Sequence, residues 1–392
     1  MSKPIKTTLG SLIEFQRGYD LPKSSFNDGK YPVISSNWIL GYHNQFKTKG
    51  PGITIGRSGT VGLPQYVETN FFPHNTSLFV KDFKGNDPKY IFYILKTFGL
   101  NERKTGSGVP TMNRNHLHPL KVLAHLDSQD QQKIASILSD LDSKIELNNN
   151  INTELEAIAK TLYDYWFVQF DFSDTNGNPY KTSGGEMVWS EELKREVPMG
   201  WEVNTINKKV KIGSGFPFDS DDYSDSGEYK IITIKNVQDG FLDTSTVDKI
   251  DFIPEKITDF CVLKIGDVLM SLTGNVGRMC FVDQEKLLLN QRVGKFNGDK
   301  NFVNYMYLFF KRPENQTRLE KIAGGSSQSN LSPIDAVKDF FAIPPQNVLN
   351  DFSGIIIPIF DQMINNKQEN QKLAELRDWL LPMLMNGQVV VE

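Results

Sequence analysis

The chain has 392 residues, which is enough for two or three domains of ordinary size. Hydrophobic residues make up 39% of the chain and charged residues 23%, so the composition is that of a folded protein and excludes wholesale disorder. Two cysteines without C-x-x-C spacing exclude a disulfide framework and a cysteine zinc site, and they favour a reducing, cytoplasmic location. No apolar stretch is long enough to cross a bilayer, and the N-terminus lacks the pattern of a secretory signal.

The charge is distributed unevenly along the chain. Residues 1–125 contain 16 Lys and Arg against 7 Asp and Glu, a net charge of +9, and they include all five histidines. Residues 126–199 carry a net charge of −8. A cationic domain suits a partner with a phosphate backbone. The alternative is a basic domain that is neutralised by the acidic segment after it.

In the first third of the chain, the pattern of apolar and turn-forming residues predicts short strands, then a short helix, then the start of a long helix. The strands are expected at 31–35, 53–56 and 77–80, and the short helix at 88–97. The long helix begins at Ser128, where the spacing to Gln131 predicts a capping box. From there apolar residues recur every three or four positions for about four heptads.

The rest of the chain repeats this order after a segment at 173–185 that is rich in turn-forming residues and is expected to be a flexible connector. Short strands are expected at 229–234, 268–272 and 280–282, and a short helix at 304–311. A second heptad stripe then starts at Phe352.

The two halves match in sequence as well as in order. Ile134–Phe167 align with Phe352–Met385 at a constant offset of 218 residues, and Gly59-Thr60-Val61-Gly62 aligns with Gly274-Asn275-Val276-Gly277 at an offset of 215. Because the matches are collinear, we interpret the chain as two copies of one unit, a strand-rich globular part followed by a long helix.

Each long helix carries a narrow apolar stripe over roughly 45 Å, which must pack against a partner. The simplest partner is the other copy, in an antiparallel coiled coil with Asn148 facing Asn366 at a pseudo-twofold axis. The alternative is a splayed helix pair with solvated asparagines. The predicted interface consists of Ile137, Leu141, Asn148, Leu155, Ile158, Leu162, Ile355, Ile359, Asn366, Leu373, Leu376 and Leu380.

No familiar catalytic motif is present in the sequence. There is no P-loop, and the Asn-Pro-Pro-aromatic tetrad that grips a flipped base is absent. A His116-x-His118 pair lacks a third metal ligand in reach. The strongest alternative to a binding protein is a stand-alone nucleic-acid-cleaving enzyme with an unrecognised metal site at Asp283–Lys286; a protein-only scaffold is a third possibility.

Candidate DNA contacts lie in and beside the small, polar turns of both globular parts. Arginine pairs with guanine edges, while lysines, hydroxyls and loop amides suit phosphate oxygens. The alternative is that these segments are ordinary loops and surface charges. The predicted contacts are Arg57, Arg103, Lys104, Ser107, Arg114, Arg278, Arg292, Lys321, Ser326 and Gln328.

Two further segments complete the pattern: Val197-Pro198-Met199-Gly200-Trp201-Glu202 before the second globular part, and the ending Leu380-Leu381-Pro382-Met383-Leu384-Met385-Asn386-Gly387. The repeat of a globular part followed by a long helix, and the Gly-Ser turns at Gly106-Ser107 and Gly325-Ser326, belong to the same pattern. Because of these features the chain resembles the specificity subunits of type I restriction–modification systems over essentially its whole length.

The resemblance implies two target-recognition domains, each reading half of a split DNA sequence, and paired helices that set the spacer and dock two methyltransferase subunits. Double-stranded DNA, these subunits and restriction subunits are the implied partners, with no membrane. S-adenosylmethionine, and ATP with Mg²⁺, are implied on the partner subunits. This chain is therefore expected to be a non-catalytic recognition and scaffold subunit that holds no cofactor, metal or catalytic residue.

The expected fold class is α+β: two similar globular α/β target-recognition domains separated by two long helices in an antiparallel coiled coil, with a pseudo-twofold internal repeat. The expected segments are 1–125 (first recognition domain), 126–170 (central helix), 171–199 (connector), 200–345 (second recognition domain) and 346–392 (distal helix and C-terminal tail).

Overall fold

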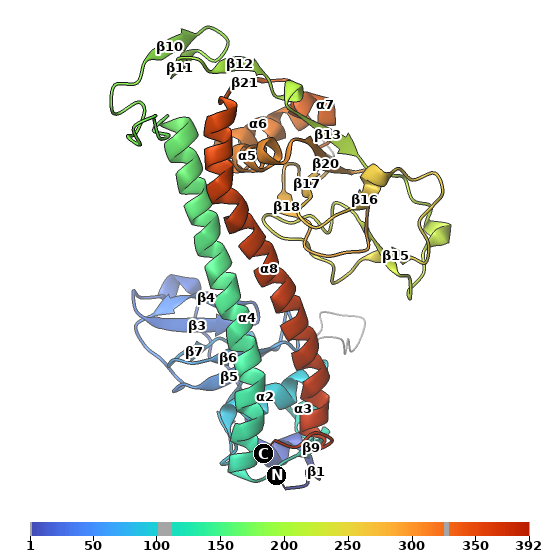
Figure 1. The fold of residues 1–392 in the computed structure, drawn as a ribbon. Helices are drawn as coiled ribbons and strands as arrows, with labels where there is room; N and C mark the ends of the chain where they lie inside the picture. Colours follow the sequence, from blue (N-terminus) through green and yellow to red (C-terminus); the bar gives the residue numbers. More distant parts are fainter. Residues whose placement is uncertain (1, 101–111, 325–328, 392) are drawn as a thin grey trace. The chain divides into compact units, whose positions relative to one another are not determined.

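The computed structural model describes residues 2–100, 112–324 and 329–391. The chain forms two compact units, Met1–Glu146 with Gln371–Glu392 (unit 1) and Leu147–Asn370 (unit 2). Each unit combines one globular domain with part of both long helices, α4 (Ser128–Tyr163) and α8 (Gln346–Met385) (Figure 1). Among the described residues, no helix is long and apolar enough to cross a membrane.

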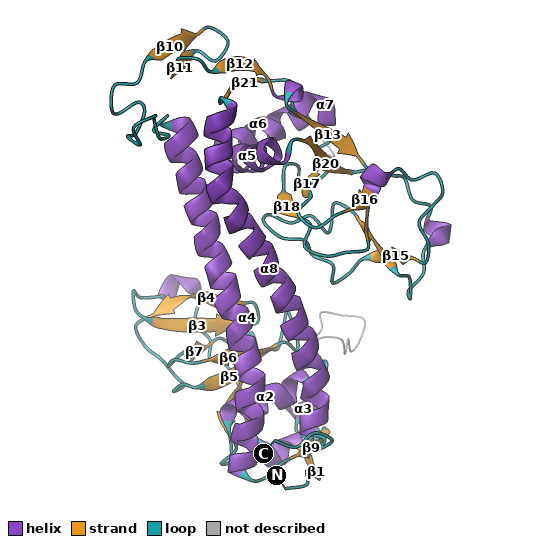
Figure 2. Cartoon of the chain, in the orientation of Figure 1, coloured by secondary structure: helices purple, strands orange, loops and turns teal. Residues whose placement is uncertain are grey.

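The globular domains are built mainly from short strands, while most of the helix lies in the long pair (Figure 2). The strands of unit 1 are β1 (Ile5–Thr8), β2 (Glu14–Arg17), β3 (Tyr31–Ser35), β4 (Trp38–His43), β5 (Gly52–Gly56), β6 (Pro64–Val67), β7 (Phe72–Pro73), β8 (Ser77–Asp82) and β9 (Lys121–Ala124). Its short helices are α1 (Leu9–Leu12), α2 (Pro88–Lys96) and α3 (Arg114–Leu117).

Unit 2 contains the corresponding elements and a few additional ones. Its strands are β10 (Met187–Ser190), β11 (Arg195–Pro198), β12 (Glu202–Thr205), β13 (Val210–Ser214), β14 (Tyr229–Ile232), β15 (Asp248–Ile250), β16 (Val262–Leu263), β17 (Val268–Ser271), β18 (Met279–Phe281), β19 (Leu287–Leu289), β20 (Val293–Gly298) and β21 (Phe340–Ile343). Its short helices are α5 (Lys300–Lys311), α6 (Pro313–Ala323) and α7 (Pro333–Ala336).

The sheets of the two units correspond, with one additional strand, β16, in the second sheet of unit 2 and a separate β10–β11 sheet. Unit 1 has a four-stranded antiparallel sheet in the order β2-β8-β5-β6, and unit 2 has β13-β20-β17-β18. A second sheet contains a parallel pair in each unit, β3–β7 or β14–β19, and a two-stranded sheet pairs β1 with β9 or β12 with β21. Corresponding strands occupy corresponding places, so the internal repeat predicted from the sequence is confirmed.

The core of unit 1 draws on both ends of the chain. Ile134 and Leu138 of α4 are fully buried beside Tyr90 of α2, and Leu384 of α8 is buried in the same cluster. The His125 ring also contacts the backbone carbonyl of Leu384, with Nε2 and the oxygen 3.2 Å apart. The first globular domain is therefore completed by the C-terminal part of α8.

The start of α4 corrects one sequence prediction. The carboxylate of Asp127 caps the helix by accepting hydrogen bonds from the backbone N–H groups of Gln129 (2.9 Å) and Asp130 (3.0 Å). Gln131 instead donates to the carbonyl oxygen of His125 (2.8 Å). The predicted capping box is wrong because Asp is as strong an N-cap as Ser and lies one residue earlier.

The segment after α4 is also more ordered than the expected flexible connector. The carboxylate of Asp171 accepts hydrogen bonds from the backbone and the hydroxyl of Thr182, at 2.8 and 2.7 Å. The rings of Phe172 and Tyr180 stack with their centroids 4.7 Å apart. These contacts fold the turn-rich residues back on themselves, and the β10–β11 hairpin follows.

The two long helices pack against each other along a seam that differs in places from the predicted one. Ile158, Ile355 and Leu376 are exposed, whereas the neighbouring Ala159 and Ile356 are fully buried. These three predictions are wrong because a straight helix has 3.6 residues per turn and drifts away from a strict heptad stripe. The other predicted positions are buried or half-buried: Ile137, Leu141, Asn148, Leu155, Leu162, Ile359, Asn366, Leu373 and Leu380.

A layer of asparagines lies in the seam within unit 2, but its pairing differs from the prediction. Asn148 donates through Nδ2 to Oδ1 of Asn370 (2.9 Å), and Asn366 donates to Oδ1 of Asn152 (2.8 Å). Asn148 and Asn366 therefore do not face each other. The seam contains two asparagine pairs rather than one, because each helix contributes two asparagines one turn apart.

Within unit 1 the seam contains an ion-pair cluster. The carboxylate of Asp142 on α4 accepts hydrogen bonds from Arg377 of α8 (2.6 Å) and from the Tyr93 hydroxyl (2.7 Å), and Lys96 lies 3.5 Å away. Burial alone would raise the pKa of Asp142, but the two hydrogen bonds and the two nearby cations outweigh it and hold the pKa below its usual value. The cluster thus joins α2, α4 and α8.

Candidate nucleic-acid interface

The matched Gly-x-Val-Gly segments form the same turn in both units. Its four glycines all have left-handed backbone conformations, which L side chains rarely adopt: φ is +85° at Gly59, +86° at Gly62, +75° at Gly274 and +83° at Gly277. The turn is closed by a hydrogen bond from Gly62 N–H to the Gly56 carbonyl, and by its counterpart from Gly277 to Ser271, each 3.0 Å long. The repeated sequence motif therefore reflects a repeated backbone conformation.

A polar cavity of about 560 Å³ lies beside this turn in unit 1. The structure brings the predicted residues Arg57 and Arg114 together in its lining, and the Arg57 carbonyl accepts a hydrogen bond from the backbone of Met112 (2.9 Å). The lining consists of Gln16, Arg17, Gly18, Tyr19, Asp20, Arg57, Leu78, Asn113, Arg114 and Asn115. Arginine and amide side chains of this kind can hydrogen-bond phosphate oxygens and base edges.

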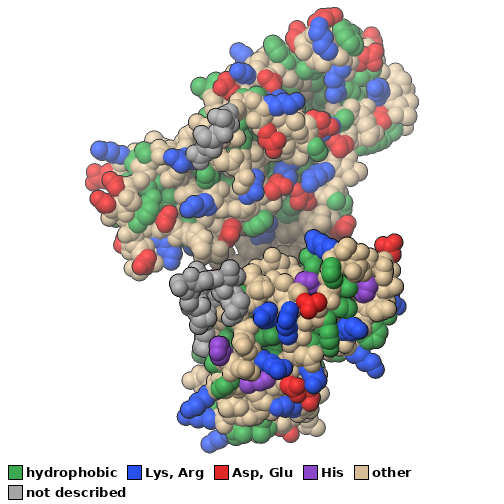
Figure 3. Space-filling model, turned by 180° about the vertical axis from the view of Figure 1, so that it is seen from behind, with side chains coloured by type: hydrophobic (Ala, Val, Ile, Leu, Met, Phe, Trp, Pro, Cys, Tyr) green, Lys and Arg blue, Asp and Glu red, His purple; other side chains and the backbone are tan. Residues whose placement is uncertain are grey.

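Sequence reasoning missed several members of this cavity. Gln16 and Arg17 lie on β2, Tyr19 follows that strand, and Asn113 and Asn115 lie at α3. Nothing in their local sequence distinguishes them from other surface residues. The pairing of β8 with both β2 and β5 brings Gln16 and Arg17 near Arg57, and the backbone hydrogen bond from Met112 to Arg57 brings Asn113 and Asn115 there. Lys and Arg side chains are scattered across the face of unit 1 that Figure 3 presents, with histidines among them.

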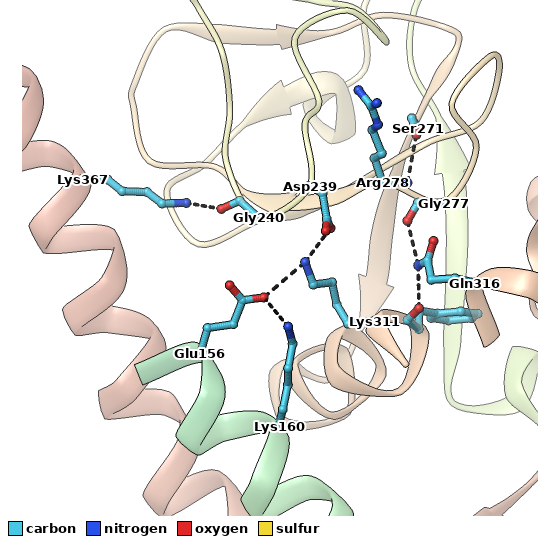
Figure 4. Close-up of polar contacts among 11 residues, drawn as sticks. Glu156, Lys160, Asp239, Gly240, Ser271, Gly277, Arg278, Lys311, Gln316 and Lys367 are labelled. Atoms are coloured by element: carbon cyan, nitrogen blue, oxygen red, sulfur yellow. Dashed lines mark hydrogen bonds and ion pairs between the residues drawn. The ribbon is translucent and has the colours of Figure 1, made fainter. Parts of the chain in front are cut away.

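Unit 2 has a cavity of about 540 Å³ beside its own copy of the turn. Gly274, Asn275 and Arg278 line it together with Lys311 and Glu320. The amide of Gln316 on α6 donates to the Gly277 carbonyl (2.9 Å), which ties the turn to the helix (Figure 4). Cations and carboxylates are mixed here, so this cavity is less cationic than the one in unit 1.

The other predicted contacts do not join these two cavities. Arg292 and Lys321 are exposed and line neither of them. Five predicted residues lie outside the described residues: Arg103, Lys104, Ser107, Ser326 and Gln328.

The Asp283–Lys286 segment does not assemble its charged groups. Asp283 is buried, and burial raises the pKa of its carboxyl. Lys286 is exposed and pairs with Glu228 at 2.8 Å. No group of three or more His, Cys, Asp or Glu side chains that could hold a metal ion occurs in residues 2–100, 112–324 and 329–391. In the His116-x-His118 motif, Nε2 of His118 accepts a hydrogen bond from the backbone N–H of Phe15 (3.0 Å).

Comparison with known proteins agrees with the duplicated architecture. A family model described as the type I restriction modification DNA specificity domain matches residues 5–157 and again residues 198–377. The MjaIX specificity subunit of Methanocaldococcus jannaschii is 28% identical over 327 residues, covering 78% of this chain and 69% of that protein. The HindI specificity subunit of Haemophilus influenzae is 26% identical over 311 residues, covering 67% and 68%.

A solved structure shares the fold. The S subunit of a type I restriction–modification system from M. genitalium superposes with a TM-score of 0.62 at 17% identity, covering 97% of this chain and 96% of that one. The family model accounts for most of the chain, and it matches twice, once in each half. The chain therefore belongs to the specificity subunits of type I restriction–modification systems, the non-catalytic components that give these systems their DNA specificity.

Proposed function

We propose that each globular domain reads one half of an interrupted DNA target, that α4 and α8 fix the length of the unread gap, and that the helix pair docks two methyltransferase subunits. The observation that carries this proposal is the duplicated topology, with a polar, arginine-containing cavity beside the same glycine turn in both units. Two globular domains of corresponding topology, linked by helices that continue from one unit into the other, are suited to bind a DNA target whose sequence is in two parts.

Exposed apolar side chains on the long helices support the docking role. Large hydrophobic residues seldom remain exposed in groups unless a partner covers them. In unit 2 these are Leu147, Ile151, Ile158 and Ile355, and in unit 1 they are Leu376 and Trp379. In such a system the cofactors S-adenosylmethionine and ATP reside on the modification and restriction subunits.

The experiment that tests the proposal shortens the helix pair. Removing seven residues from α4 and the seven that pair with them from α8 shortens each helix by roughly 10 Å. At 3.4 Å per base pair, the unread gap should lose about three base pairs. The measurement is the sequence motif at which bases are methylated. It is mapped by sequencing DNA from host cells that carry either the wild-type gene or the shortened one.

The expected result is a motif with both halves unchanged and a shorter gap. A gap of unchanged length, with methylation retained, contradicts the spacer role. The control removes seven residues from the mostly exposed, acidic segment at 219–228, which lies outside α4 and α8, and should leave the gap as it was.

A further inference from the structure

The side chain of Arg278 is hydrogen-bonded to a turn at residues 238–241, which contacts both long helices. Its guanidinium donates through Nη1 to Oε1 of Gln238 (2.5 Å), and its backbone N–H donates to the hydroxyl of Ser271 (3.1 Å). The Gln238 amide in turn donates to the Lys235 carbonyl (2.7 Å). The arginine is thus held at both its backbone and its charged end, beside the cavity that it lines.

The turn that carries Gln238 runs to Phe241 and is closed by a backbone hydrogen bond between these two residues (3.0 Å). Gly240 has a left-handed backbone (φ +84°), and its N–H donates to the Met279 carbonyl on β18 (2.8 Å). A Cβ atom at Gly240 would lie 3.7 Å from Glu156 and 3.9 Å from Lys311, so the turn approaches the long helix closely.

Two lysines anchor this turn from the other side (Figure 4). Lys311, at the end of α5, has a side chain that is only 5% exposed, and it lies between Asp239 of the turn and Glu156 of α4, 3.2 Å from the latter. Lys367 of α8 donates to the carbonyl oxygen of Gly240. The turn is therefore fixed to α4 through the buried side chain of Lys311 and to α8 by the half-buried Lys367.

We propose that Gln238 is a positioning residue for DNA recognition, which holds the guanidinium of Arg278 in place through a turn that Lys311 and Lys367 fasten to the helix pair. The inference rests on the proposed function, because it takes Arg278 to contact DNA. An arginine that is already ordered loses less side-chain freedom on binding than a mobile one. The helix pair would thereby set the orientation of a DNA contact as well as the spacing of the domains.

The test is a double-mutant cycle on the full-length chain assembled with its methyltransferase subunits. The probe is a pool of DNA duplexes of random sequence, from which the wild-type complex selects its target; the selected duplex then serves for titration. The variants are Gln238→Leu, Arg278→Ala and the two together. Gln346→Leu is the matched control, since Gln346 bonds only to Asn350 among the described contacts and lies outside the cavity.

We expect Gln238→Leu to weaken binding about threefold to tenfold, the range for ordering one rotamer-rich side chain on binding. It should also relax selection in one half of the target only. In the Arg278→Ala background, Gln238→Leu should have no further effect, because its action passes through the arginine. Lys367→Met should act in the same direction as Gln238→Leu, and its effect should vanish in the same background.

Three results would overturn the inference. If Gln238→Leu binds like the wild type while Arg278→Ala is weakened, the positioning role is refuted and the proposed function stands. If the two effects multiply, Gln238 acts independently of Arg278. If Arg278→Ala binds like the wild type, Arg278 is no DNA contact; selection of an interrupted motif by the wild-type complex would still support the two-part reading.

Discussion

Replacing Asn152 by leucine tests the asparagine layer of the helix pair. Asn152 is 9% exposed, accepts a hydrogen bond from Asn366, and donates to the Met363 carbonyl (3.1 Å). The Met363 carbonyl lies inside α8 and keeps its helical partner. The side-chain amide of Asn366, however, would have a buried N–H group without an acceptor, which costs about 1–3 kcal/mol. With the lost hydrogen bond and the added apolar contact, we expect a net destabilisation of about 2 kcal/mol.

Thermal unfolding of the full chain measures this change. For a unit of roughly 150–250 residues, about 2 kcal/mol corresponds to a fall in Tm of about 4–8 °C. The double variant Asn152→Leu/Asn366→Leu removes donor and acceptor together and should recover most of that loss. Asn150→Leu, on the exposed face of the same helix, is the control. A rise in Tm for the single variant, or a further fall for the double variant, refutes a hydrogen-bonded layer.

Three more predictions concern DNA, partners and pH. Arg114→Ala should reduce the slope of log affinity against log salt by about one, if it removes one phosphate contact; an unchanged slope in a salt titration argues against that contact. Ile158→Glu, at a position 48% exposed, should lower the amount of methyltransferase subunit that copurifies while leaving Tm unchanged; equal copurification speaks against docking there. The lowered pKa of Asp142 contributes stability that is present above the unfolded pKa of about 3.9 and is lost as pH falls through the folded value. Asp142→Asn should therefore flatten the fall in Tm on acidification below about pH 4, and an equally steep fall would contradict the ion-pair account.

Much of the architecture could be predicted because it is repeated in the sequence. The strand at 31–35 and the helix at 88–97 follow from local turn signals and apolar patterns, and they agree with β3 and α2 to within one residue. The collinear matches revealed the duplication without any knowledge of strand pairing. Heptad spacing located both long helices, since their apolar stripes extend over many turns.

Details that depend on tertiary contacts could not be predicted in the same way. Whether Ile158 or Ala159 enters the seam depends on accumulated helix rotation, which a heptad pattern does not specify. The pairing of Asn148 with Asn370 depends on a register set by both helices. Gln16 and Asn113 meet in one cavity only because strand pairing brings distant segments together, and neither residue carries a local signal.

The composition of the unit 1 core has a consequence for protein synthesis. Leu381, Leu384 and Met385 pack into a cluster whose other members come from the first 138 residues. Domains at the N-terminus commonly fold while the ribosome is still translating the remainder. In this chain the first globular domain keeps an open apolar surface until residues 381–385 have been translated and can pack into the cluster. Its folding is therefore tied to the synthesis of α8, more than 200 residues later in the chain, and chaperones would be needed most during that interval.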